Sequence, residues 1–154
     1  MITTIEPTLD NLTLNITQEM HVKASLQATF DALLEQMGPE NETHEGKPMP
    51  MVIEARPGGR WYRDLGRENG HLWGHVQAIK RPELLEICGP LFLSYPVISN
   101  VQYRLKEMDG GTLITFRHSA LGFIPDDYRQ GLGKGWAHIL DRARKHAEAP
   151  RKTH

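Results

Sequence analysis

The sequence contains one cysteine, no long apolar run and almost no excess of either charge. Cys88 is the single cysteine among 154 residues, so no internal disulfide can form, which is typical of a reducing compartment. No apolar stretch approaches the roughly 20 residues that a membrane-spanning helix needs. The chain does not begin with a basic segment followed by an apolar run, so we expect no signal peptide. We therefore predict a soluble, cytoplasmic protein.

The two signs of charge are nearly balanced, and this balance limits the partners. Lysines and arginines number 18 against 19 aspartates and glutamates, which gives a net charge of -1. A domain that binds nucleic acid through its phosphates usually carries a clear basic excess. We therefore expect no nucleic-acid partner.

Eight histidines raise the question of a metal site. His71 and His75 are four residues apart, but on the strand predicted there this spacing separates them by roughly 13 Å. His138 and His146 are eight residues apart on a predicted helix, which is about 12 Å. Cys88 has no second cysteine in a C-x-x-C pattern. Because metal ligands must converge on one ion, we predict no metal and no cofactor.

The stretch GLGKGW, residues 131–136, has the composition of a phosphate-binding loop. A Walker-type loop reads GxxxxGK followed by serine or threonine, whereas Trp136 follows here and the spacing of the glycines differs. The glycines also fall inside an apolar stripe with helical spacing, where each costs about 1 kcal/mol relative to alanine. We interpret them as the start of a helix that lies close to the sheet or faces a cavity, with a frayed or kinked first turn as the alternative.

Signatures of nucleophilic catalysis are missing as well. The chain has no GxSxG elbow. Cys88, which precedes Gly89-Pro90, is predicted to be a core residue at a strand end. The adjacent carboxylates Asp126 and Asp127 lie at the start of the last predicted helix, where helix capping already explains them.

Hydrophobic periodicity predicts a strand, a helix, a run of strands and a long last helix. Residues 12–22 alternate apolar and polar side chains, which is the period of a strand. Ser25 is the predicted N-cap of a helix that ends at Gly38-Pro39, and residues 38–50 are a polar excursion. Further strands are predicted at 51–55, 60–64, 72–79, 84–88, 97–106 and 112–118, followed by a helix from Asp126 to the residues before Pro150.

Tight turns separate the predicted strands. RPGGR, residues 56–60, and DGG, residues 109–111, contain glycines that allow positive φ. Asn69-Gly70 is the strongest short hairpin signal in the chain. Strands joined by tight turns are antiparallel, so residues 51–118 predict a meander. The predicted fold class is α+β: a curved antiparallel β-sheet wrapped around a long C-terminal helix, with an N-terminal helical segment after the first strand.

Several stretches, in their order and spacing, resemble a known superfamily. They are FDALL (30–34), PGGRWYRD (57–64), LWGHVQAIKRP (72–82), GTLITFRHSALG (111–122) and GKGWAHIL (133–140). The sequence resembles the START/Bet v 1-like (SRPBCC) helix-grip domains, and within them the polyketide cyclase/dehydrase and Hsp90-ATPase-activator-homologue group. The resemblance covers about residues 12–148. It implies a hydrophobic cavity between sheet and last helix; members bind lipids, polyketides, hormones and other apolar molecules, and some are cyclases or hydrolases.

Helix stripe and strand parity select candidate residues for such a cavity. Trp136 and Leu132 fall on the apolar stripe of the last helix. Tyr103 shares the inward parity of its strand neighbours, and His118 that of Ile114 and Phe116. A plain core position is the alternative for each of them. The predicted ligand-binding residues are Trp73, Tyr103, Phe116, Leu132 and Trp136, with His118 as the polar anchor and the candidate catalytic residue.

Sequence leaves the facing of two strands open. Residues 60–63 alternate so that one aromatic faces inward, and an inward arginine would indicate an anionic ligand. On the middle strand, Trp73 and His75 are expected on one face and Gly74 on the other. The residues whose inward or outward facing stays open are Arg60, Trp61, Tyr62, Arg63, Trp73 and His75.

Three functional hypotheses follow for a single domain over residues 1–154. The first is binding of a hydrophobic or amphipathic small molecule in a cavity between the sheet and the C-terminal helix. The second is an enzyme of the cyclase, dehydratase or hydrolase type that uses His118 as acid or base. The third is a protein-interaction module resembling an Hsp90 co-chaperone domain. A homodimer is compatible with all three.

Overall fold

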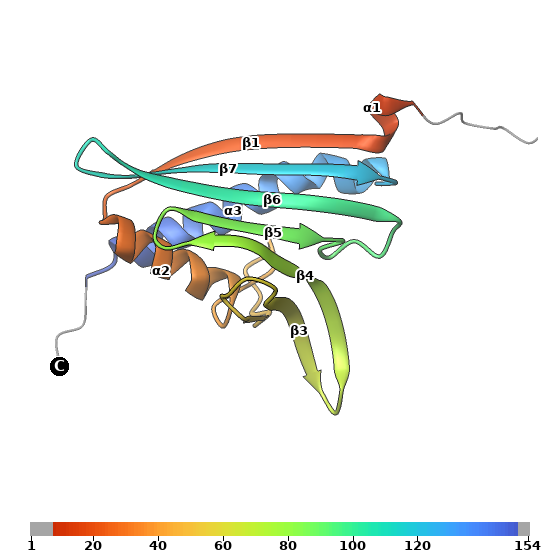
Figure 1. The fold of residues 1–154 in the computed structure, drawn as a ribbon, viewed down its shortest axis with the longest axis horizontal. Helices are drawn as coiled ribbons and strands as arrows, with labels where there is room; N and C mark the ends of the chain where they lie inside the picture. Colours follow the sequence, from red (N-terminus) through yellow and green to blue (C-terminus); the bar gives the residue numbers. More distant parts are fainter. Residues whose placement is uncertain (1–7, 151–154) are drawn as a thin grey trace, which may run out of the picture.

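The protein folds as a seven-stranded antiparallel sheet that curves around one long helix (Figure 1). The structure is a computed structural model and describes residues 8–150; the predicted domain, 1–154, includes ends that lie outside this range. The strand order β1-β7-β6-β5-β4-β3-β2 confirms the predicted meander and fold class. The elements are α1 (Leu9–Leu12), β1 (Thr13–Val22), α2 (Leu26–Met37), β2 (Val52–Ile53), β3 (Arg60–Gly66), β4 (Asn69–Lys80), β5 (Leu84–Gly89), β6 (Val97–Met108), β7 (Gly111–Gly122) and α3 (Asp126–Glu148).

Side-chain hydrogen bonds cap the N-termini of the first two helices, α1 and α2. The Ser25 hydroxyl accepts a 3.1 Å hydrogen bond from the Ala28 amide, which confirms the predicted N-cap of α2. The sequence does not predict α1. This single turn begins where the Thr8 hydroxyl accepts from the Asn11 amide, and it lies ahead of the alternating pattern that identifies β1.

The hairpin between β3 and β4 turns earlier than the sequence predicts. Arg67 and Glu68 form the turn with φ of 54° and 62°, while Asn69-Gly70 already begins β4, so the prediction that Asn69-Gly70 is the turn is wrong. The Asn69 side chain donates to the carbonyls of Gly66 and Arg67 at 3.1 and 3.0 Å. These bonds satisfy turn carbonyls and hold two non-glycine residues at positive φ.

An irregularity in the pairing of β3 with β4 decides which residues of β4 face inward. The register shifts after Trp61, which leaves Trp73 as an extra residue on β4. Trp73 is consequently buried whereas His75 is exposed, so the expectation that these two residues share a face is wrong. A strict period of two cannot anticipate the extra residue.

The side chains of β3 also take definite faces. Trp61 is buried and donates its indole N–H to a main-chain carbonyl of α2 at 2.8 Å. Arg60 lies on the outer face, where it pairs with Glu54 at 2.8 Å and covers the ring of Tyr62 at 4.7 Å. Arg63 is half-buried. Arg60 is therefore paired with the Glu54 carboxylate on the outer face and does not reach the interior.

Cys88 lies on the outer face of β5. It is half-buried, and its sulfur contacts the side chains of Gln77 and Asn100. The buried positions of this strand are Leu85 and Ile87. The prediction of Cys88 as a core residue is therefore wrong, because its parity along β5 is opposite to that of the core residues.

α3 crosses beneath the sheet and lies beside α2 (Figure 1). Its 23 residues span roughly 34 Å. The predicted stripe is buried at Leu132, Trp136 and Ala143, but Tyr128 near the helix start is 41% exposed. Among residues 8–150, no helix combines the length and the apolar character needed to cross a membrane.

Candidate ligand-binding pocket

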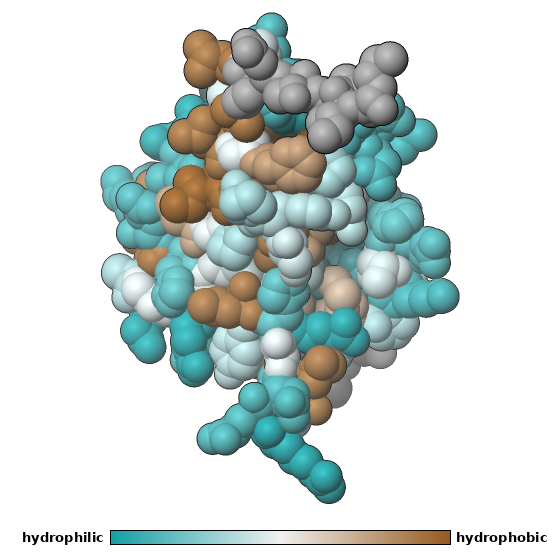
Figure 2. All heavy atoms as spheres, turned by 90° about the vertical axis from the view of Figure 1, so that its right-hand side faces the viewer, coloured by the Kyte–Doolittle hydropathy of each residue, from teal (hydrophilic) through white to brown (hydrophobic). Residues whose placement is uncertain are grey.

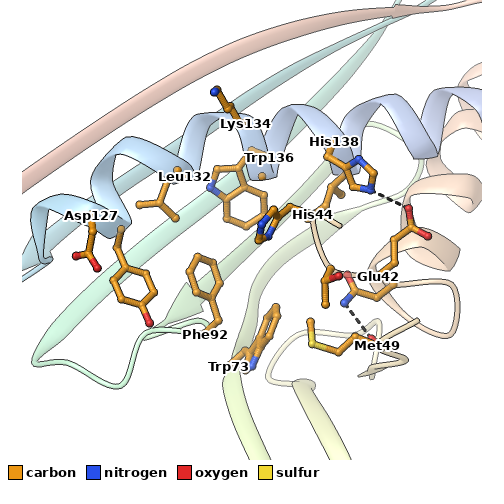
Figure 3. A pocket seen from close by; sticks show the side chains of 16 residues that line it. Glu42, His44, Met49, Trp73, Phe92, Asp127, Leu132, Lys134, Trp136 and His138 are labelled. Atoms are coloured by element: carbon orange, nitrogen blue, oxygen red, sulfur yellow. Dashed lines mark hydrogen bonds and ion pairs between the residues drawn. The ribbon is translucent and has the colours of Figure 1, made fainter. Parts of the chain in front are cut away.

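A pocket of about 680 Å³ opens between the first half of α3 and the sheet (Figure 3). Residues of α3 from Asp127 to Ile139 form one wall. Trp73 of β4 and Phe92 of the β5–β6 loop form the opposite wall, and residues 41–44 with Met49 line one end. The predicted location of a cavity, between sheet and last helix, therefore contains a pocket in this structure.

Aromatic rings lie on both walls of the pocket. Trp136 extends from α3, and Trp73 and Phe92 face it from the other side (Figure 3). The Trp73 ring contacts Phe92 edge-on with centroids 5.6 Å apart, and Trp61 behind it at 4.9 Å. Because each ring is held by its neighbour, the apolar walls are largely pre-formed, as in most small-molecule sites.

The glycines of α3 face two different environments. Gly131 and Gly135 line the pocket, and a Cβ atom added to either would meet no other group within 4 Å. A Cβ on Gly133 would instead lie 3.8 Å from Nε2 of Gln18, which is ordinary contact, and Gln18 donates to the Gly133 carbonyl at 2.7 Å. Close packing therefore requires none of the three. The pocket-lining pair keeps space open along the helix.

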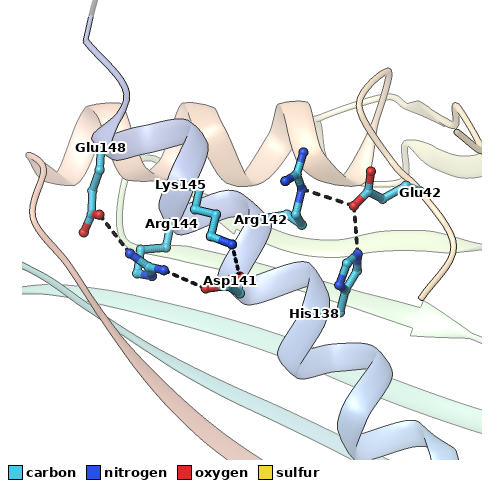
Figure 4. A network of polar contacts seen from close by, with 7 residues as sticks. All are labelled: Glu42, His138, Asp141, Arg142, Arg144, Lys145 and Glu148. Carbon is cyan, nitrogen blue, oxygen red and sulfur yellow. Dashed lines mark hydrogen bonds and ion pairs between the residues drawn. The ribbon is translucent and has the colours of Figure 1, made fainter. Parts of the chain in front are cut away.

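The segment before β2 supplies a polar end to the pocket. Oε1 of Glu42 accepts a hydrogen bond from Nε2 of His138 at 2.8 Å and forms an ion pair with Nε of Arg142 at 3.1 Å (Figure 4). The Glu42 side chain is only 15% exposed, so solvent screens these pairs less than at an open surface. Glu42 and His138 both line the pocket. Their contact ties residues 41–49 to α3.

His118 is a buried histidine behind the pocket, and both of its ring nitrogens are occupied. The Trp136 indole N–H donates to Nδ1 at 3.0 Å. An indole nitrogen can only donate, so the proton of His118 is on Nε2, which donates to the Ser99 hydroxyl at 2.9 Å. Burial lowers the pKa of His118 to about 4, so the ring is neutral at pH 7. His118 thereby fixes the orientation of Trp136.

Tyr103 and Phe116 lie one layer deeper than Trp136. Ring centroids are 5.0 Å apart for Tyr103 and Phe116 and 4.8 Å apart for Phe116 and Trp136. Both deeper rings are fully buried. The Tyr103 hydroxyl has no hydrogen-bond partner among residues 8–150, and burial raises its pKa. These two rings support the Trp136 wall from behind.

The six predicted binding residues therefore occupy two layers. Strand parity and helix stripe identify the inward facing of five of them correctly, whereas the facing of Trp73 was left open, and neither pattern indicates depth. Trp73, Leu132 and Trp136 line the pocket, whereas Tyr103, Phe116 and His118 lie in the core and do not.

Sequence reasoning missed Phe92, Met49 and Glu42, which all line the pocket. They come from segments without strand or helix periodicity, where no pattern indicates facing. The only sequence signal near any of them is the polar segment 38–50, which contains Glu42 and Met49 and to which the sequence analysis assigns no function. Within residues 8–150, no three histidine, cysteine or carboxylate side chains gather as they would around a metal ion.

Comparison with known proteins gives a family match and a set of similar folds. The sequence profile of the family described as Activator of Hsp90 ATPase homolog 1-like protein matches residues 46–148. A search of curated protein sequences gave no match.

Three solved structures illustrate the similarity of fold. A protein from Rhizobium leguminosarum has a TM-score of 0.68 and 18% identity, covering 88% of this chain and 95% of that one. The di-domain ARO/CYC StfQ from the steffimycin biosynthetic pathway has a TM-score of 0.65 and 14% identity, covering 91% of this chain and 52% of that one. Ara h 8.0201 has a TM-score of 0.64 and 15% identity, covering 88% and 97%. At these identities the likeness is one of fold.

Proposed function

The chain belongs to the Activator of Hsp90 ATPase homolog 1-like family, and from this premise we propose that it binds an apolar or amphipathic small molecule in the pocket under α3. One observation carries the proposal. Gly131 and Gly135 leave the pocket wall open at positions where alanine would fit without contact. Glycine costs a helix about 1 kcal/mol relative to alanine, and space for a ligand offsets this cost. A pocket of about 680 Å³ is also within the range of small-molecule sites.

Binding can be tested with a neutral fluorescent probe and a pocket-filling variant. 1-Hydroxypyrene should bind the wild-type protein and raise its unfolding temperature, because a ligand of the folded state stabilises it. Gly135→Leu places a large side chain in the pocket and should abolish both effects. Ala137→Leu adds the same side chain on the exposed side of α3 and should retain them.

The proposal fails if wild type neither binds the probe nor carries a guest in native mass spectrometry. It fails equally if Gly135→Leu and Ala137→Leu bind with the same affinity. The enzymatic hypothesis stays a prediction that the geometry does not favour, because both nitrogens of His118 are engaged and the ring is shielded from the pocket by Trp136.

A second candidate function, contact with another protein, is favoured by an exposed apolar surface at one end of the sheet. Ile98 of β6 and Leu121 of β7 are cross-strand partners that are 69% and 59% exposed. Phe123, just after β7, is 52% exposed, and Figure 2 shows apolar surface on this end of the molecule. Larger exposed apolar patches often mark interaction sites.

The family description suggests the assay for this candidate. If the surface contacts an Hsp90-type chaperone, the protein should raise the chaperone's ATPase rate, and Ile98→Asp with Leu121→Asp should remove the effect. Equal stimulation by the variant would reject the surface. Gly135→Leu should leave this activity unchanged, which separates the two candidates.

A further inference from the structure

We propose that the pocket selects ligands that carry a hydrogen-bond donor, a hydroxyl or ammonium group attached to an apolar ring system, over ligands that carry a carboxylate. This inference rests on the proposed function, since it concerns the chemistry of the same pocket. It follows from the charges that line the pocket and from a buried acceptor atom that has no partner among residues 8–150.

Negative charge lies at both ends of the pocket. Glu42 lines one end and Asp127 the other, and Figure 3 shows them on opposite sides of the aromatic walls. Asp127 and His138, which contacts Glu42, are eleven residues apart on α3, or roughly 16 Å. The pocket is therefore elongated along the helix, with acidic groups at its two ends and rings between them.

Among residues 8–150, no lysine or arginine that lines the pocket is placed to receive an anion. Lys134 is the only lysine or arginine among the lining residues, and its side chain points away from the cavity in Figure 3. Arg142 forms an ion pair with Glu42, and His138 hydrogen-bonds to the same carboxylate. The positive groups nearest the polar end are thus already used in holding a carboxylate. A ligand carboxylate at this end would lie near the Glu42 carboxylate, which is unfavourable in a partly buried site. His44, the other histidine of the lining, has a side chain that is 74% exposed and lies 3.9 Å from Glu45, so solvent weakens any pairing that it offers to an anion.

One acceptor atom at the polar end is buried and lacks a partner among the described residues. Asn41 is 2% exposed and lines the pocket; its Nδ2 donates to the Met49 carbonyl at 3.0 Å, which leaves Oδ1 without a hydrogen bond. Since a carbonyl can only accept, the amide nitrogen must face Met49 and the oxygen must be the unpaired atom. The polar contacts of Glu42 with His138 and Arg142 both involve Oε1, so its carboxylate lies at the same end of the pocket as Asn41.

An unpaired buried acceptor is costly, and a ligand that donates to it removes that cost. Leaving a buried acceptor unpaired costs about 1–3 kcal/mol, which corresponds to an affinity difference of the order of ten-fold. The gain requires a donor on the ligand. An ether or a carboxylate at the same position would leave Oδ1 of Asn41 unsatisfied.

A matched series of pyrenes tests this selectivity on the full-length protein. 1-Hydroxypyrene and 1-pyrenemethylamine carry donors, 1-methoxypyrene has none, and 1-pyrenecarboxylate is an anion of the same ring. Fluorescence titration should rank the two donors roughly ten-fold or more above the ether, and the carboxylate last. Glu42→Gln should reduce the preference for the amine over the carboxylate, whereas Glu45→Gln, an exposed change in the same segment, should leave the order intact.

Ratios between ligands distinguish recognition from support of the pocket wall. If Glu42 only held residues 41–49 against α3, Glu42→Gln would weaken all four pyrenes by the same factor and leave their ratios unchanged, and the inference would be overturned. Tighter binding of the carboxylate than of the amine to wild type would overturn it as well, while the proposed function would stand. Absence of binding by every pyrene would overturn this inference, and if native mass spectrometry also showed no guest, the proposed function would fall with it.

Discussion

Replacing the pocket-lining glycines of α3 by alanine should make the protein more stable and its ligand bind less well. An added Cβ at Gly131 or Gly135 meets no other group within 4 Å, so the substitution creates no clash. Alanine favours a helix by about 1 kcal/mol over glycine, so Gly131→Ala with Gly135→Ala should add about 2 kcal/mol to the free energy of unfolding. For a chain of this length that is an increase of about 4–8 °C in the unfolding temperature.

Gly133→Ala is the matched control two residues away. Its Cβ would be in ordinary contact with Gln18, outside the pocket lining, so it should stabilise the protein comparably without changing ligand affinity. Urea denaturation of each apo variant measures stability, and titration with 1-hydroxypyrene measures binding. If the pocket glycines serve tight packing after all, Gly131→Ala and Gly135→Ala would lower the free energy of unfolding, and that result would refute the reasoning.

Three further predictions concern buried polar groups and a helix cap. His118 takes up a proton near pH 4 in the folded state but near pH 6.5 in the unfolded state, so protonation of His118 should lower the free energy of unfolding by about 3 kcal/mol between pH 7 and pH 4. His118→Gln should flatten this part of the profile of stability against pH. An NMR titration of wild-type His118 with a midpoint near pH 6.5 would contradict this prediction. Tyr103→Phe removes an unpartnered buried hydroxyl and should be neutral or stabilising by up to about 1 kcal/mol in chemical denaturation, so a clear loss would reveal a partner such as bound water. Ser25→Ala removes the N-cap of α2 and should cost about 1 kcal/mol, whereas Ser25→Asp should restore most of it, and equal stability of all three proteins would argue against the cap.

The sequence predicts the architecture well because the architecture depends on repeated local signals. Alternation identifies β1, β6 and β7, and the stripe of α3 is regular enough to place Trp136 against the sheet. In each of these elements several residues indicate which face is buried, so a single exception does not change the predicted orientation of the element. The errors at Trp73 and at Asn69-Gly70 have the opposite origin, since one extra residue in a register depends on the partner strand.

The pocket was predictable in location but not in chemistry. Strand parity indicates that His118 faces inward. Only the structure shows that Trp136 and Ser99 lie within hydrogen-bond distance of its two ring nitrogens. Glu42 and Phe92 come from irregular segments whose conformation is set by tertiary contacts. Sequence periodicity carries no information about such residues, and they supply the polar end and one apolar wall.

Two of the three tryptophans border the pocket, and the third, Trp61, lies directly behind one of them. Most of the protein's intrinsic ultraviolet emission therefore originates at or next to the pocket. A ligand that displaces water from Trp73 and Trp136 should shift the wavelength of tryptophan emission, and no attached label is needed to detect it. Intrinsic tryptophan fluorescence could therefore report ligand binding to the pocket, and large compound collections could be screened with the unlabelled protein.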